Sequence, residues 1–274
     1  MITMENIAQY QGANISSGKN YLYILPNALL RPYISHYCVS FPTPQTMSDE
    51  YSVLPSASSV MCISVDGGEI NTSYNGTNTK ASVVGDYANK KELLLLIKFQ
   101  SGGFFPFYGF HQDELADQTL DLSCIDKTLA AEINNGLEKS RCMEDLIITL
   151  DAIFLNHLKV NNDYVTVVMN KIITRNGNIT VREISTDFHY SEKHIRRLFL
   201  QHIGVSVKKF SRIVRLNYAL QLLQNNNMLF TDIAEQSAFF DQPHFIHDFK
   251  SLCGLTPQEY TQNMSVFYNY NFTL

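Results

Sequence analysis

One pattern of caps, helices and turns occurs twice in the last third of the chain, and it restricts the fold more than any other feature. The first copy reads ITVREISTDFHYSEKHIRRLFLQHIG and the second reads LFTDIAEQSAFFDQPHFIHDFKSLCG. Each copy has a capping residue, a short helical stretch, a three-residue turn, a second cap, a helix with an apolar stripe and a final Gly. We therefore expect two helix-turn-helix units, with caps at Thr180 and Ser191 in the first and at Thr231 and Asp241 in the second.

The segment between the two copies, SVKKFSRIVRLNYALQLLQNNN, predicts a connecting helix that Ser206 caps and the Asn run stops. Two helix-turn-helix units on one rigid helix present their second helices on the same side, which suits successive major grooves about 34 Å apart. The sequence thus predicts an all-α domain over residues 161–265, followed by a tail at 266–274.

Charge is distributed unevenly along the chain. The formal net charge is -5, but residues 175–215 carry nine Lys and Arg against three Asp and Glu. Residues 216–274 carry one basic residue against five acidic ones. A basic segment of this kind is what contact with phosphates needs, so the first unit is suited to nucleic acid and the second adds little phosphate attraction.

The first part of the chain has a different texture. Short apolar runs such as VMCISV are broken by turn signals, Asp66-Gly67-Gly68 and Asn75-Gly76, which are typical of hairpins. They predict a β-rich, cupin-like domain over residues 1–160, with helices at its C-terminal end. There, an apolar stripe over Met143–Leu158 either packs inside the domain or forms a homodimer. KVNNDY, at 159–164, is the expected boundary, and the predicted fold class is α+β.

The span Ile179–Tyr260 resembles the DNA-binding domain of the AraC/XylS family of transcriptional regulators. The resemblance is carried by SEKHIRRLF, IGVS, RLNYALQLL, DIAEQSAFFDQPHFIHDFK and GLTPQEY, in the family's order and spacing. More weakly, RPYISHYCVS and the region around SGGFFPFYGF resemble a sensor-type N-terminal domain. The resemblance implies a bacterial, cytoplasmic regulator of transcription that binds double-stranded promoter DNA. It leans towards an activator, for which RNA polymerase would be a partner.

The helix after Ser191 holds the first set of candidate DNA-binding residues. Ile195, Leu198 and Phe199 form its apolar stripe, and the outer side is left with Lys193, Arg196 and Arg197. An Arg can bind the O6 and N7 of guanine through two hydrogen bonds, and the family resemblance implies the same helix face. The alternative is that these are solvated surface charges.

The helix after Asp241 has a different outer face. Its buried stripe is Phe245, Phe249 and Leu252, and the groove-facing candidates are Gln242, Pro243, Ile246, His247 and Lys250. Family members often have Arg where His247 stands and Gly where Ala238 stands. We therefore expect unequal binding, in which the first unit supplies most of the affinity and base reading and the second tunes or bends the DNA site.

Other site classes find little support. His244, His247 and Cys253 are spread too far along one helix to hold a metal without further ligands, and the β-rich part has no His-x-His pair. No nucleotide-binding, hydrolase or zinc-protease motif occurs, so we expect no enzyme activity, metal or cofactor. Five scattered cysteines without a C-x-x-C pair fit a reducing cytoplasm, and the longest apolar run, LLLLI, is far short of the roughly 20 residues that span a bilayer.

The segment SGGFFPFYGF is the candidate for an effector site. Its side chains Phe104, Phe105, Phe107 and Tyr108 either line an apolar pocket for a small molecule or pack the core of the β-rich domain. Two functions stay open at this point. One is a transcription regulator controlled by an unknown effector at its N-terminal domain, and the other is a ligand-binding or enzymatic N-terminal domain with a degenerate DNA-binding tail.

Overall fold

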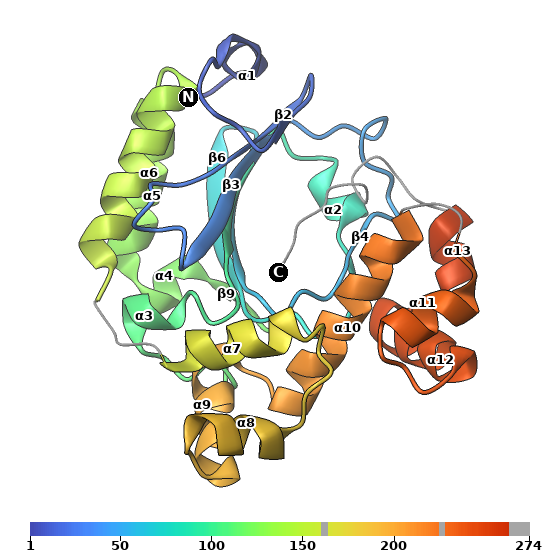
Figure 1. Ribbon diagram of the computed structural model, residues 1–274. Helices are drawn as coiled ribbons and strands as arrows, with labels where there is room; N and C mark the ends of the chain where they lie inside the picture. The colour runs from blue at the N-terminus through green and yellow to red at the C-terminus, as the bar shows by residue number, and fades with distance from the viewer. Residues whose placement is uncertain (160–163, 225–227, 263–274) are drawn as a thin grey trace.

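The computed structural model describes residues 1–159, 164–224 and 228–262 of the 274-residue chain. A β-rich part lies beside a helical part (Figure 1), and the α+β fold class is confirmed. The expected boundary at 159–164 and the tail at 266–274 fall largely or wholly outside the described residues.

One antiparallel seven-stranded sheet forms the β-rich part, in the order β1-β2-β3-β8-β5-β6-β9, and two further strands, β4 and β7, pair with each other. The strands β5 and β6 form a hairpin in which Asp66 pairs with Glu69, and Gly67 and Gly68 both have positive φ. This is the turn that Asp-Gly-Gly predicts, because a two-residue loop matches the twist of its strands when both residues are left-handed. The strands are β1 (Ser16–Ser17), β2 (Tyr21–Ile24), β3 (Ile34–Ser40), β4 (Ser52–Val53), β5 (Val60–Asp66), β6 (Glu69–Asn75), β7 (Ser82–Val83), β8 (Leu93–Phe99) and β9 (Thr119–Asp121).

The second turn signal, Asn75-Gly76, was expected to form a hairpin, and that prediction was wrong. β6 ends at Asn75, but its next partner is β9, which pairs Thr119 with Asn75. A Cβ at Gly76 would lie 1.8 Å from the carbonyl oxygen of Leu115. Glycine is therefore required here because two backbone segments approach closely, not because the chain reverses.

Helices cover one face of the sheet. Side chains from β8, including Leu95, Ile97 and Phe99, pack with side chains from α5 and α6 in one apolar core. The α6 stripe belongs to this core, with Met143 and Phe154 among its buried members. The helices of this part are α1 (Met4–Gln9), α2 (Gly85–Ala88), α3 (Phe105–Tyr108), α4 (Leu122–Ile125), α5 (Lys127–Lys139) and α6 (Met143–His157).

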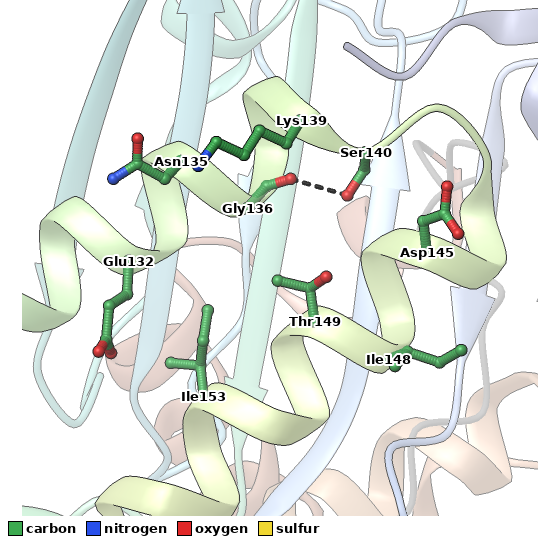
Figure 2. A pocket seen from close by; sticks show the side chains of 9 residues that line it. All are labelled: Glu132, Asn135, Gly136, Lys139, Ser140, Asp145, Ile148, Thr149 and Ile153. Atoms are coloured by element: carbon green, nitrogen blue, oxygen red, sulfur yellow. Dashed lines mark hydrogen bonds between the residues drawn. The ribbon is translucent and has the colours of Figure 1, made fainter.

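The outer sides of α5 and α6 form a groove between the two helices, and Figure 2 shows the residues that line it. Gly136 allows the close approach, since a Cβ there would lie 2.9 Å from the Cγ2 of Thr149. The hydroxyl of Ser140 donates to the carbonyl oxygen of Gly136 at 2.7 Å, which satisfies a carbonyl at the end of α5. Ile148 on α6 is 68% exposed beside this groove. The homodimer through Met143–Leu158 stays a prediction.

The helical part contains two apolar cores that share α10. The first half of α10 packs with α7, α8 and α9, and its second half packs with α11, α12 and α13. Both predicted helix-turn-helix units are therefore present, at opposite ends of α10 (Figure 1). The helices are α7 (Tyr164–Thr174), α8 (Val181–Phe188), α9 (Glu192–Ile203), α10 (Val207–Gln224), α11 (Phe230–Gln236), α12 (Gln242–Cys253) and α13 (Pro257–Gln262).

Three of the four predicted caps in the two units are confirmed. Thr180 forms a capping box with Glu183, and Ser191 and Asp241 each accept a backbone N–H from the first turn of their helices. Thr231 is not a cap. The N-cap is Leu229, two residues earlier, and α11 begins at Phe230, whose ring packs against that of Phe245 in the second core at a centroid distance of 6.4 Å.

Candidate nucleic-acid interface

The exposed face of α9 carries the first set of predicted residues. Ile195 and Phe199 are each 1% exposed and hold α9 in the first core. The side chains on the opposite side are those of Lys193, Arg196 and Arg197, and all three residues are exposed. The helix periodicity thus brings three cations together on one free face, as the sequence predicts.

Two of these cations have weak partners on the same helix. Arg196 Nη2 lies 3.0 Å from Glu192 Oε2, and Arg197 Nη2 lies 3.2 Å from His194 Nδ1. Both contacts are exposed. The Arg196–Glu192 pair is an exposed i, i+4 ion pair, which contributes only a few tenths of a kcal/mol, and the Arg197–His194 contact joins no opposite charges. A phosphate or a guanine can replace them at little cost.

The exposed face of α12 is chemically different. Phe245, Phe249 and Leu252 are buried in the second core, as predicted. An open groove on the outer side is lined by Pro243, Ile246, His247, Lys250 and Ser251. Lys250 is the one permanent cation in that lining, while Ile246 also packs partly against the core.

A charge pair fixes the orientation of α12 against the connecting helix. Asp248 is only 6% exposed, and its two carboxylate oxygens accept hydrogen bonds from Arg212 Nε at 3.1 Å and Nη2 at 2.7 Å. Arg215, one turn further along α10, lies with its guanidinium 5.5 Å from the ring centre of Phe239. The two hydrogen bonds from Arg212 to Asp248 set both the distance and the angle between α10 and α12.

The basic segment is therefore less available to phosphates than its residue count indicates. Arg212 is paired with Asp248, and Lys209 Nζ donates to the hydroxyl of Thr79 at 2.7 Å. Sequence reasoning placed the whole segment on a phosphate-facing surface, whereas in the structure the α9 face presents Lys193, Arg196 and Arg197 as a cluster of exposed cations. The sequence signal for the buried pair was Asp248, an acidic residue beside the apolar stripe of α12.

Loops of the β-rich part hold the C-terminal ends of both second helices. Thr77 Oγ1 donates to the carbonyl oxygen of Ile203, the last residue of α9, at 2.6 Å. The N–H of Ala81 donates to the carbonyl oxygen of Leu252, near the end of α12, at 2.8 Å. Residues 77–81 therefore bridge the two units, and we call this segment the clamp loop.

Two further contacts attach the β-rich part to α9 and leave its cationic face free. The N–H of Gln112 donates to the carbonyl oxygen of Gln201 at 2.9 Å. The ring of Phe105 stacks on that of His202 with centroids 3.8 Å apart. Both contacts lie in the last turn of α9, beyond Arg197, so docking of the β-rich part leaves the candidate DNA-binding side chains exposed.

The predicted effector residues make contacts inside the protein. Phe104 and Phe107 are each 1% exposed and pack against Phe99 in the core of the sheet. Phe105 stacks on α9, as described above, and the hydroxyl of Tyr108 lies 3.3 Å from His157 Nδ1. Their role in an effector site stays a prediction.

The His and Cys residues of α12 serve its local structure. His244 Nδ1 accepts the backbone N–H of Phe240 at 3.2 Å, which ties the turn to the start of the helix. Cys253 is buried, and burial raises the pKa of its thiol to about 12. Among the residues that the structure describes, no group of three or more His, Cys, Asp or Glu side chains is placed to hold a metal ion. The helices of the described ranges include none long and apolar enough to span a membrane.

Comparison with known proteins identifies the helical part. Residues 184–263 match a family model described as a helix-turn-helix domain. The chain is 31% identical over 84 residues to the HTH-type regulator YtdP of Bacillus subtilis, covering 31% of this chain and 11% of that protein. It is 24% identical over 153 residues to the lactose operon transcription activator of Staphylococcus xylosus, covering 54% and 55% of the two chains. It is 28% identical over 98 residues to the activator RhaR of Escherichia coli, covering 34% and 35%.

The chain thus spans about half the length, or less, of these curated relatives. Solved structures resemble it distantly. ToxT from Vibrio cholerae has a TM-score of 0.43 at 14% identity, covering 84% of this chain and 93% of that one. The C-terminal domain of AraT from Geobacillus stearothermophilus has a TM-score of 0.33 at 18% identity, covering 39% and 91%.

Two helix-turn-helix units on one connecting helix, each with an exposed second helix, define a DNA-binding domain of the double helix-turn-helix class. Residues 184–263 are an AraC-type helix-turn-helix domain, and the resemblance to AraC/XylS regulators is confirmed.

Proposed function

We propose that this protein is a sequence-specific DNA-binding regulator of transcription in which α9 supplies most of the affinity and base reading. The observation that carries the proposal is the exposed face of α9, where Lys193, Arg196 and Arg197 are open to solvent in an AraC-type domain. A second helix of this kind lies in the major groove, where an Arg forms two hydrogen bonds with guanine.

The two units contribute unequally because their free charges differ. The α12 groove has Lys250 as its single permanent cation, and five acidic residues lie between 216 and 274. The sequence-independent part of DNA binding grows with the number of phosphates that cations neutralise. The second unit therefore tunes or bends the site rather than anchoring the complex.

Control by the N-terminal part is the finer half of the proposal. A small-molecule effector there changes the clamp loop or the Phe105–His202 stack, and through them the relative placement of α9 and α12. An effector that favours one placement shifts the population able to bind two adjacent grooves. Two relatives are named as activators, which supports activation with RNA polymerase as a partner. A homodimer through Met143–Leu158 would use the outer side of α6, where Ile148 is exposed, because the apolar stripe is buried in the core.

The test is a binding titration with the full chain. Duplexes selected by the chain from a random-sequence pool serve as the probe. Arg196→Ala is expected to lose about 1–3 kcal/mol of binding free energy and to relax the base preference at one position, because it removes a bidentate contact. His247→Ala is expected to lose less.

Arg141→Ala is the matched control, because Arg141 is exposed on the β-rich part and its loss changes the net charge by the same amount. It should leave the base preference unchanged. A larger loss for His247→Ala than for Arg196→Ala contradicts the unequal roles. Recovery of random sequences without enrichment contradicts the function itself and favours a degenerate DNA-binding tail.

A further inference from the structure

The turn before α12 holds two consecutive Phe residues in opposite environments. Phe239 is buried and packs against Phe245 with ring centroids 5.2 Å apart. Phe240 is 92% exposed, the highest value among the large apolar side chains that the structure describes. Its backbone is fixed by the N–H bond to His244, so the ring is held in solvent by an ordered turn.

Phe240 lies beside the N-terminal end of α12, the end of a second helix that contacts base edges in helix-turn-helix units. It directly precedes Asp241, the N-cap of α12. Pro243 and Ile246, in the first half of α12, line the outer groove of this helix. The N-terminal end of α12 therefore presents apolar side chains to solvent, whereas the exposed face of α9 presents guanidinium groups.

The two acidic residues nearest this face are engaged in contacts within the protein. The side chain of Asp241 accepts the backbone N–H of His244, and Asp248 is buried against Arg212. What α12 offers to a groove is the Phe240 ring, Pro243 and Ile246, with Gln242 and His247 as neighbouring polar groups.

Major-groove chemistry selects the partner of such a surface. The base edges there are hydrogen-bond donors and acceptors, except for the C5 methyl group of thymine. Resting on the proposed function, we infer that α12 reads thymine methyl groups through Phe240, Pro243 and Ile246, while α9 reads guanine. The DNA site then has a guanine-containing half and a thymine-containing half.

The rigid attachment of α12 favours DNA as the occupant of this face. The Arg212–Asp248 pair holds α12 on α10, and the clamp loop bonds to the ends of both α9 and α12. When α9 enters one groove, α12 is carried with it towards the next. Lys250, at the far end of the groove, is placed to take a phosphate.

The test replaces thymine by deoxyuridine, which lacks only the methyl group. Duplexes are first selected from a random pool by the full chain, and deoxyuridine is then placed in either half-site. In the thymine half, we expect affinity to fall about fourfold for each contacted methyl group, from the roughly 0.8 kcal/mol gained on burying one such carbon. In the guanine half, the same replacement should change affinity less than twofold.

Phe240→Ser assigns the effect to the residue. Because Phe240 is almost fully exposed, this variant should melt at the temperature of the unsubstituted chain. It should lose affinity for the thymine duplex and match the unsubstituted chain on the deoxyuridine duplex. Leu29→Ser, at a residue 68% exposed on the β-rich part, is the matched control and should match the unsubstituted chain on both duplexes.

Four results overturn the inference while leaving the proposed function intact. The first is an enriched site with guanine or cytosine throughout the second half, and the second is equal affinity for the thymine and deoxyuridine duplexes. The third is a Phe240→Ser loss of the same size on both duplexes. The fourth is a Phe240→Ser chain that binds both duplexes normally, which leaves the face to a protein partner. Failure of the proposed function looks different, because selection then enriches no sequence at all.

Discussion

Gly204 and Gly254 end the second helices of the two units, and replacing each by alanine distinguishes two losses of stability. One is the cost of a left-handed residue with a Cβ, and the other is the cost of displacing the β-rich part. Gly204 follows α9 with φ +85°, and Gly254 follows α12 with φ +80°. A Cβ at Gly204 would lie 2.6 Å from the carbonyl oxygen of Gln112, whereas a Cβ at Gly254 has no atom within 4 Å. The two positions share a backbone conformation and differ in the docked neighbour.

The magnitudes follow from these contacts. A left-handed conformation costs a residue with a Cβ about 1–2 kcal/mol, so Gly254→Ala should lower the free energy of unfolding by that amount. Gly204→Ala has the same cost and also displaces the Gln112 backbone. That displacement weakens the bonds from Gln112 to Gln201 and from Thr77 to Ile203, at about 0.5–1.5 kcal/mol each. We expect a total of about 2–5 kcal/mol for Gly204→Ala.

Urea unfolding of both variants measures the totals, and amide hydrogen exchange locates the damage. The Gln112 amide, which donates to the carbonyl oxygen of Gln201, should lose protection in Gly204→Ala and keep it in Gly254→Ala. An equal loss of unfolding free energy in the two variants, with the Gln112 amide protected in both, would refute the idea that the β-rich part packs tightly against the end of α9.

Two further predictions concern buried charges. Lys98 Nζ donates to Ser56 Oγ at 2.8 Å, and burial lowers the pKa of this lysine to about 8. The folded pKa lies below the unfolded value of 10.5, so the free-energy cost of burying the ammonium is full below pH 8 and disappears above pH 10.5. Lys98→Met should therefore raise the free energy of unfolding by up to about 3 kcal/mol at pH 7 and leave it unchanged at pH 11. Thermal melts at the two pH values measure this difference. Asp248→Asn leaves Arg212 without its counter-charge and should lower the free energy of unfolding in urea by about 3 kcal/mol. The control Glu235→Gln, on the exposed side of α11, should lower it by less than about 0.5 kcal/mol. Similar costs for the two variants would contradict a structural role for the Arg212–Asp248 pair.

The helix-turn-helix units were predictable because their signals are local. A cap at Ser191 or Asp241 acts within three residues, and the Phe245–Phe249 stripe lies within one helix. The failure at Thr231 has the opposite cause. A contact of Phe230 with the second core, made through tertiary packing, accompanies a start of α11 two residues before the predicted one.

The contacts between the two parts of the chain were not predictable from the sequence. Thr77 reaches Ile203 across 126 positions, and Ala81 uses only its backbone N–H, so neither residue type marks the contact. Charge counting failed for a related reason. Lys209 and Arg212 add to the basic total, but the fold directs them to Thr79 and Asp248.

Methylation interference on the selected duplexes tests the unequal roles of α9 and α12 most directly. A methyl group on guanine N7 blocks the bidentate contact of an Arg. The free cations of α9 and the apolar face of α12 predict strong interference at guanines of one half-site only, and loss of that interference in Arg196→Ala. Equal interference in both half-sites would contradict the unequal roles, and no interference in either would contradict guanine reading by α9.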